Sequence, residues 1–134
     1  MATNRIIIFH PTHTEVRRVP ERTDLFDLCR SFNQNDFVEV QVLRRDDDGK
    51  YLYILMSENN LRSLPLNENG DLKEFQAASR RWRRIGWNPM QRGTFIVAYM
   101  QDVEEGEDED GEIIMYEKVL DLGANSVNEY FALY

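Results

Sequence analysis

Apolar and polar residues alternate along much of this 134-residue chain, and a period of two is the pattern of a β-strand. Every second residue from 38 to 42 is valine, an Asp-Asp-Asp-Gly cluster typical of turns follows at 46–49, and a second alternating segment covers 51–56. We therefore expect a β-hairpin. Its return strand would carry leucine, isoleucine and methionine on one face and Tyr51 and Tyr53 on the other.

Four later segments have the patterns of short elements. They are a strand at 61–66 that contains Pro65, a helix at 72–81, and strands at 95–100 and 112–119. Asn125 or Ser126 can cap a C-terminal helix that runs through Phe131. The chain is thus predicted to be mainly β, with five strands and a helix between the third and fourth, which is the outline of a five-stranded OB-fold barrel.

The first 36 residues differ in character from the rest. A strand is expected at 5–9, and Thr23 can cap an amphipathic helix whose apolar side includes Leu25 and Phe32. The length of the chain supports one domain. We expect residues 1–36 to form an N-terminal extension, a strand plus a short helix, that packs on the OB-fold domain of residues 37–134.

The chain has 16 Lys and Arg against 24 Asp and Glu, a net charge of −8, and one segment explains this excess. Residues 102–112 contain eight carboxylates and no basic residue, so the rest has 24 − 8 = 16 acids against 16 bases. An acidic segment on a neutral domain does not exclude an anionic partner. We expect a mobile, solvated loop at 102–112. It nearly matches a calcium loop starting at Gly106, but glycine replaces the first carboxylate and the flanks are strand-like, so we reject calcium.

The sequence contains no motif for catalysis, a metal or a cofactor. His10 and His13 have too few companion ligands for a metal site, and the single cysteine, Cys29, cannot form an internal disulfide. The longest apolar run, 95–100, is too short to span a membrane, and the N-terminus lacks a signal-type segment. We therefore expect a cytoplasmic binding protein, not an enzyme, with no catalytic, metal or cofactor site and no membrane contact.

The strongest indication of function is a basic segment at 73–92, where six cations face a single acid for a local charge of +5. Trp82 and Trp87 lie among its arginines. Guanidinium groups pair with phosphates and indoles stack on bases, so the segment predicts contact with single-stranded or loop RNA. Tyr51 and Tyr53 would extend this surface. The alternatives are a solvated arginine face with one tryptophan in the core, and ordinary strand aromatics.

Three parts of the segment 37–130 resemble translation initiation factor 1A of eukaryotes and archaea, the counterpart of bacterial initiation factor 1. Residues 37–43 with the following turn are similar to that family's first hairpin, and 81–87 with 93–102 to its basic tryptophan segment and fourth strand. Residues 111–116, with the helix predicted at 125–130, are similar to its fifth strand and following helix.

The chain departs from the family pattern at several points. Residues 88–92 are inserted between Trp87 and the fourth strand, Thr94 stands in place of an acid, and the acidic segment before the fifth strand is extended. The basic N-terminal tail and the acidic C-terminal tail of the family have no counterpart in this sequence. Of the two tryptophans, Trp87 is the better match.

The resemblance implies a monomer that binds the decoding region of the small ribosomal subunit, together with other initiation factors. The basic segment and the resemblance together predict RNA contacts at Arg80, Arg81, Trp82, Arg83, Arg84, Trp87, Arg92, Tyr53 and Arg62. Two alternatives remain. One is a general OB-fold protein for single-stranded nucleic acid. The other is a protein-interaction module in which the acidic loop and the N-terminal extension dock partners.

Overall fold

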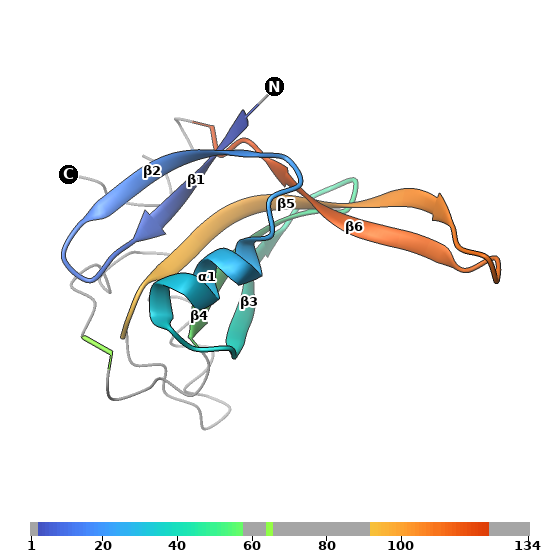
Figure 1. The fold of residues 1–134 in the computed structure, drawn as a ribbon. Helices are drawn as coiled ribbons and strands as arrows, with labels where there is room; N and C mark the ends of the chain where they lie inside the picture. Colours follow the sequence, from blue (N-terminus) through green and yellow to red (C-terminus); the bar gives the residue numbers. More distant parts are fainter. Residues whose placement is uncertain (1–2, 58–63, 66–91, 124–134) are drawn as a thin grey trace, which may run out of the picture.

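The computed structural model describes residues 3–57, 64–65 and 92–123, and Figure 1 shows their arrangement. The chain is mainly β, with six strands and one helix in this described part. In chain order the elements are β1 (Thr3–Phe9), β2 (Thr14–Pro20), α1 (Leu25–Asn33), β3 (Val38–Arg45), β4 (Lys50–Ser57), β5 (Phe95–Glu107) and β6 (Ile113–Leu120). The helices predicted at 72–81 and 125–131, and most of the strand predicted at 61–66, lie outside the described residues.

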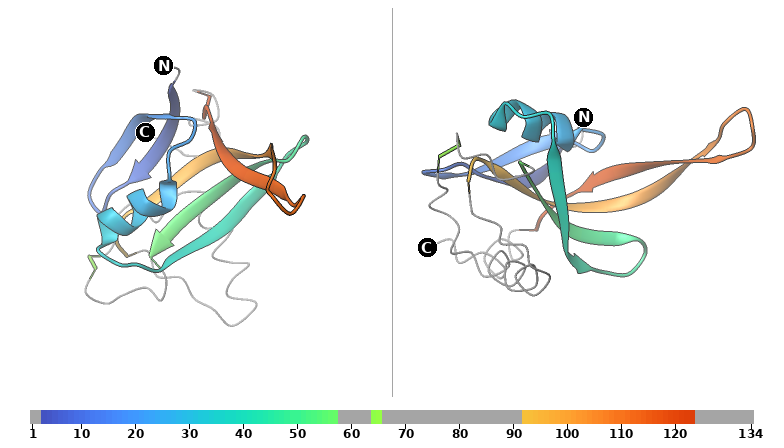
Figure 2. Two further views of the ribbon diagram at one scale, coloured as in Figure 1. Left: turned by 45° about the vertical axis from the view of Figure 1, so that its right-hand side comes forward. Right: turned by 90° about the horizontal axis from the view of Figure 1, so that it is seen from below.

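The strands form one antiparallel sheet organised on β5. The order is β2-β1-β5-β4-β3, and β6 also pairs with β5. One edge of β5 pairs with β4 over residues 96–101. The other edge pairs first with β1 over 95–97 and then with β6 over 99–107. The described strands leave this sheet open, so the predicted five-stranded barrel is not confirmed (Figure 2).

The N-terminal segment is built into the same sheet. β1 lies where a strand is predicted and pairs with β5, whereas the alternation pattern does not predict β2. Only Val19 of the seven residues in β2 is buried, so its charged residues hide the period of two. Asp24 rather than Thr23 caps α1, because the Asp24 side chain accepts a hydrogen bond from the Asp27 amide. Thr23 instead donates its hydroxyl hydrogen to the Pro20 carbonyl.

Helix α1 lies across one face of the sheet, as Figures 1 and 2 show. Leu25 and Cys29 of the helix pack with strand residues that include Ile8, Tyr53 and Ile96, all of them buried. Burying each large apolar side chain stabilises the fold by roughly 1.5–3 kcal/mol relative to leaving it exposed. The two tyrosines of β4 therefore face the helix, and its leucine and isoleucine residues at 52 and 54 are buried on the opposite face, as the alternation predicts.

The acidic segment is mostly strand, not the predicted loop at 102–112. β5 continues through Glu107, and with β6 it forms a two-stranded ribbon that projects beyond the rest of the sheet (Figure 1). Only the turn at 108–112 closes it, where the Asp108 carboxylate accepts hydrogen bonds from the amides of Asp110 and Glu112. Acidic residues have low strand propensity, which is why the sequence predicts a loop; pairing with the apolar residues of β6 overrides that preference.

A buried asparagine joins α1 to the start of β5. Asn33 is 2% exposed; its Oδ1 accepts from the Thr94 amide at 2.8 Å and its Nδ2 donates to the Thr94 carbonyl at 2.9 Å. The neighbouring Gly93 has a φ of +76°, and a Cβ there would lie 2.4 Å from Asn33 Oδ1. Only glycine therefore fits beside this pair of hydrogen bonds.

We expect Asn33→Ala to lower the free energy of unfolding by about 2–4 kcal/mol, because it leaves a buried amide and a buried carbonyl of Thr94 without partners. Urea unfolding followed by circular dichroism measures the change. Ser31→Ala, on the exposed side of α1, is the control and should change stability by less than about 0.5 kcal/mol. Equal effects of the two substitutions would contradict the bridging role of Asn33.

Candidate functional site

Two of the nine predicted RNA contacts, Tyr53 and Arg92, lie in the described part of the chain. The other seven lie outside it; they are Arg62, Arg80, Arg81, Trp82, Arg83, Arg84 and Trp87. The structure therefore places one border of the basic segment, Arg92, next to the sheet, while the contacts within that segment stay a prediction.

Arg92 stands where the basic segment ends and β5 is about to begin. Its Nη1 donates to the Leu64 carbonyl at 3.0 Å, and the Gly93 amide donates to the Pro65 carbonyl at 2.8 Å. These bonds hold the residues on either side of segment 66–91 next to each other. The two borders of segment 66–91 therefore meet next to the N-terminal end of β5.

Tyr53 is not an exposed stacking surface. It is 2% exposed, and its ring packs with Tyr51 in an edge-on arrangement, with 5.6 Å between ring centroids. Burial, followed by the charge of Glu117, raises the pKa of Tyr53. This burial contradicts the expectation that Tyr53 contacts RNA. Helix α1 covers this face of β4, so the ring belongs to the core.

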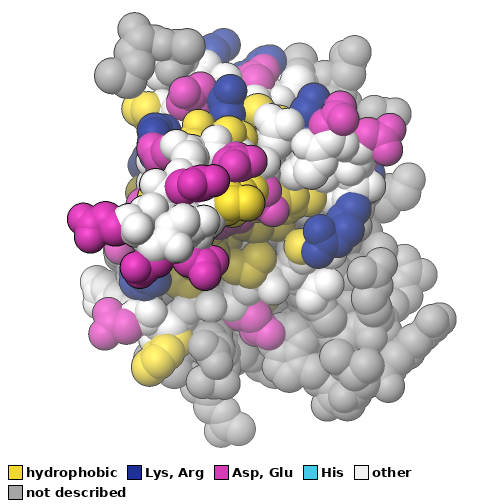
Figure 3. Space-filling model, turned by 90° about the vertical axis from the view of Figure 1, so that its right-hand side faces the viewer, with side chains coloured by type: hydrophobic (Ala, Val, Ile, Leu, Met, Phe, Trp, Pro, Cys, Tyr) yellow, Lys and Arg dark blue, Asp and Glu magenta, His cyan; other side chains and the backbone are white. Residues whose placement is uncertain are grey.

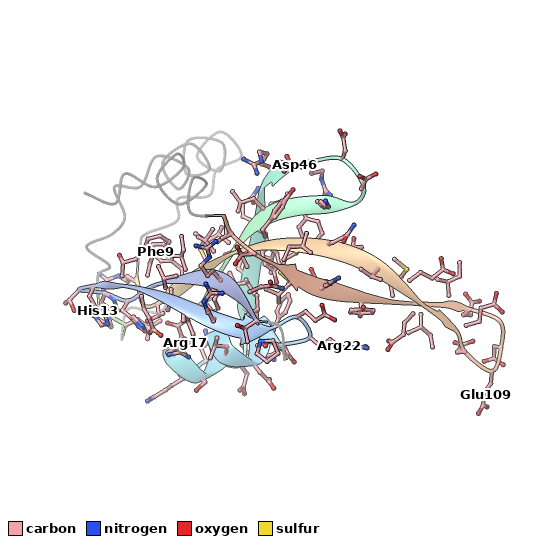
Figure 4. All side chains as sticks on the ribbon, turned by 90° about the horizontal axis from the view of Figure 1, so that it is seen from above. Phe9, His13, Arg17, Arg22, Asp46 and Glu109 are labelled. Carbon is pink, nitrogen blue, oxygen red and sulfur yellow. The ribbon has the colours of Figure 1, made fainter. Side chains whose placement is uncertain are left out.

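Arg92, the described end of the basic segment, and the acidic turn at 108–112 lie at opposite ends of β5. The basic segment ends at Arg92, beside the first residue of the strand, and the acidic turn follows the last. At about 3.3 Å per residue, the two ends of a strand of 13 residues are about 40 Å apart along the strand. Figure 4 shows Glu109 at the far tip of the ribbon, away from the sheet.

A hollow of about 310 Å³ opens where the ribbon leaves the sheet. Phe26, Val40 and Val42 form an apolar wall, Asp102 and Glu117 supply two carboxylates, and Arg45 supplies one guanidinium group. Tyr51 lies between the two acids, and its hydroxyl contacts Asp102 Oδ1 at 3.0 Å and also Glu117 Oε2. Two carboxylates against one guanidinium group leave an excess of negative charge beside the apolar wall, which suits a cationic group with an apolar stem.

Tyr51 separates two carboxylates that the sheet places directly opposite each other. Asp102 and Glu117 are cross-strand partners, and like charges in such a position repel. A phenol has one hydrogen to donate, so the hydroxyl satisfies one carboxylate at a time. Burial, followed by the hydrogen bonds to Glu117 and Asp102, raises the pKa of Tyr51 above its usual value near 10. Tyr51 is therefore a neutral hydrogen-bond donor at neutral pH.

Arg22 ties the base of the ribbon to the turn between β2 and α1. Its Nη2 donates to Glu105 Oε1 at 2.6 Å, and its guanidinium carbon lies 4.1 Å from the centre of the Tyr116 ring. Beside it, the Val119 amide donates to the Glu21 carbonyl at 2.8 Å. Figure 4 shows Arg22 next to the ribbon's base. The sequence pattern does not predict this contact, because Arg22 lies 83 residues from Glu105 and 94 residues from Tyr116 along the chain.

The histidines have a structural explanation. His10 Nε2 lies 2.8 Å from Glu15 Oε1, and its ring stacks on His13 and packs edge-on against Phe32. Within residues 3–57, 64–65 and 92–123, no group of three or more histidine, cysteine or acidic side chains is arranged to hold a metal ion.

No family model, curated protein or solved structure matches this chain. Among the described helices, none has the length and apolar character needed to cross a membrane.

The raised pKa values of Tyr51 and Tyr53 predict a loss of stability in alkali. A raised pKa means that the folded protein holds the phenolic proton more tightly than the unfolded chain. The resulting stabilisation is present below about pH 10 and is lost as the pH rises above it, at about 1.4 kcal/mol per pH unit for each tyrosine.

Tyr51→Phe should therefore show a shallower fall in unfolding free energy between pH 10 and pH 11 than the wild-type protein. Urea titrations at a series of pH values, with tyrosinate absorbance recorded in parallel, measure this difference. Because all other titrating groups are shared, parallel pH profiles for the two proteins would show that Tyr51 ionises normally in the folded state.

Proposed function

We propose that this chain is a non-enzymatic, cytoplasmic RNA-binding protein of the initiation factor 1A type, which contacts the decoding region of the small ribosomal subunit through its basic segment, 73–92. The observation that supports it is the separation of charge along β5. The basic segment ends at one end of this strand, and the acidic ribbon projects from the other.

The distance decides whether the acidic ribbon would oppose RNA binding. At an ionic strength of 0.1 M the Debye length is about 10 Å, so charges separated by about 40 Å are screened from each other. Phosphates bound at the basic end of β5 therefore experience little repulsion from the carboxylates of the ribbon tip. The net charge of −8 does not describe the field at the proposed RNA surface.

The hydrogen bonds at residues 64–65 and 92–93 give the proposal its second support. They fix the borders of segment 66–91 on the sheet, so its arginines and tryptophans belong to a connection that leaves and rejoins the fold at one place. Arginine forks bind phosphate and indole rings stack on bases without sequence preference. The OB-fold barrel is part of the same proposal, because its closure requires a strand at 61–66, of which the structure describes residues 64–65 alone.

We expect the protein to bind single-stranded RNA with an affinity that falls as salt rises. Three to five phosphate contacts would give a slope of about −2 to −3.5 in a plot of log affinity against log salt concentration. Fluorescence anisotropy with a labelled RNA between about 50 and 300 mM salt measures it. Absence of binding at the lowest salt would refute the RNA-binding proposal.

The double substitution Arg81→Glu with Arg84→Glu should weaken RNA binding at least about tenfold, because it replaces two proposed phosphate contacts with like charges. The matched control is Arg18→Glu with Arg45→Glu, which makes the same change in net charge at exposed positions of β2 and β3. We expect the control to stay within about threefold of the wild-type affinity. Equal losses in both variants would assign the binding to net charge alone.

Co-sedimentation with isolated small ribosomal subunits separates the initiation-factor proposal from a general single-strand binder. The wild-type protein should pellet with subunits, and the Arg81→Glu, Arg84→Glu variant should stay in the supernatant. Binding to short RNA without binding to subunits would favour the general nucleic-acid-binding protein.

A further inference from the structure

The distal half of β6 exposes large apolar side chains. Ile113 is 58% exposed, Met115 54% and Ile114 41%, and all three lie on the projecting ribbon. Figure 3 looks at the end of the ribbon and shows hydrophobic side chains surrounded by acidic ones. A strand that only connected two parts of the sheet would not need apolar residues there, so this surface suggests a partner.

Acidic side chains lie directly beside these apolar residues. In the register of the ribbon, Glu107 is opposite Ile113 and Glu104 is opposite Met115. Neither glutamate forms an ion pair with any residue that the structure describes, whereas Glu105 is paired with Arg22. The ribbon therefore presents alternating apolar and negative side chains on one face.

The same face continues into the hollow at the base of the ribbon. Residues 113, 115 and 117 of β6 share a face because strand side chains alternate, and Glu117 lines the hollow with its cross-strand partner Asp102. We call this continuous surface the ribbon face and define it by Asp102, Glu104, Glu107, Ile113, Met115 and Glu117.

The ribbon is held in place at its base, and no described strand pairs with the edges of its distal half. The contacts of Arg22 with Glu105 and Tyr116 attach its base to the turn before α1, so the ribbon face is ordered before a partner arrives. Within the described part of the chain, no strand pairs with the outer edge of β6 or with β5 beyond Gln101 except β6 itself. Free edges offer backbone hydrogen bonds to an extended segment.

We propose that the ribbon face binds an extended segment of a partner protein in which lysine or arginine alternates with apolar residues. The apolar side chains would cover Ile113 and Met115, and the cations would pair with Glu104 and Glu107 and reach the hollow at Asp102 and Glu117. The negative charge of the ribbon face favours a cationic segment over the other possible occupants. A second copy of the ribbon and an RNA strand are both negative, so like-charge repulsion disfavours each of them.

The experiment uses the full chain and a fluorescently labelled synthetic peptide of ten residues in which lysine alternates with valine. Anisotropy at about 150 mM salt limits the measurement to short-range contacts, because the Debye length is then about 8 Å. Peptides that alternate lysine with serine, and glutamate with valine, test the two components separately. We expect binding of the lysine–valine peptide, at least tenfold weaker binding of the lysine–serine peptide and no binding of the glutamate–valine peptide.

Two double variants map the surface. Glu104→Lys with Glu107→Lys, and Ile113→Ser with Met115→Ser, should each weaken binding of the lysine–valine peptide at least tenfold. The matched control, Glu109→Lys with Asp110→Lys at the ribbon tip, makes the same charge change outside the ribbon face and should stay within threefold. Equal losses in the charge variant and its control, or no loss in the apolar variant, would overturn the proposal and leave only non-specific attraction to acid.

Three further measurements make the outcome decisive. Circular dichroism and urea unfolding test whether each variant is folded. If the apolar variant is not folded, nuclear magnetic resonance of the wild-type protein replaces it: the peptide should shift the methyl resonances of Ile113 and Met115, and unshifted methyls would overturn the proposal.

Sedimentation of the free protein should show a monomer. Self-association that excludes the peptide would overturn the proposal and assign the ribbon face to a second copy of the chain. RNA should not displace the peptide, since the proposal does not depend on RNA binding.

Discussion

A β-strand has two edges, and the fold depends on how β5 uses them. One edge carries β4, while the other is divided between β1 at its beginning and β6 along the remainder. A strand of 13 residues is long enough for this division, and its last residues extend beyond every strand except β6. The core under α1, the hollow and the ribbon are all placed by this arrangement, because each is built on a different stretch of the same strand.

Two carboxylates repel each other at the point where the ribbon leaves the sheet. Pairing β5 with β6 places Asp102 directly opposite Glu117, and Tyr51 from the neighbouring strand supplies the hydrogen-bond donor between them. A phenol suits this position because it stays neutral and adds no charge to a crowded acidic site. Arg22 removes part of the repulsion farther out by pairing with Glu105. Stability at this junction thus comes from residues on three separate segments.

Local patterns in the sequence predict local features, and the contacts between distant segments explain where prediction fails. The β3–β4 hairpin and the facing of its tyrosines follow from alternation alone. The burial of Tyr53 does not, because it requires knowing that α1 covers that face. The acidic ribbon is missed for a similar reason: the partner that keeps it extended is β6, whose apolar residues give no sign of remaining exposed. Most residues of the predicted RNA surface lie outside the described part, so that prediction stays as the sequence makes it.

Hydrogen bonds join residues 64–65 to residues 92–93, so the two borders of segment 66–91 lie next to each other. β4 and β5 are adjacent and antiparallel, so everything between them is, in topological terms, the connection of a hairpin. The pairs between β4 and β5 join residues 50–55 to residues 96–101, and the borders of segment 66–91 are joined by hydrogen bonds of their own. The register of these two strands is therefore specified by residues outside the arginine- and tryptophan-rich segment, and that sequence is not what sets it.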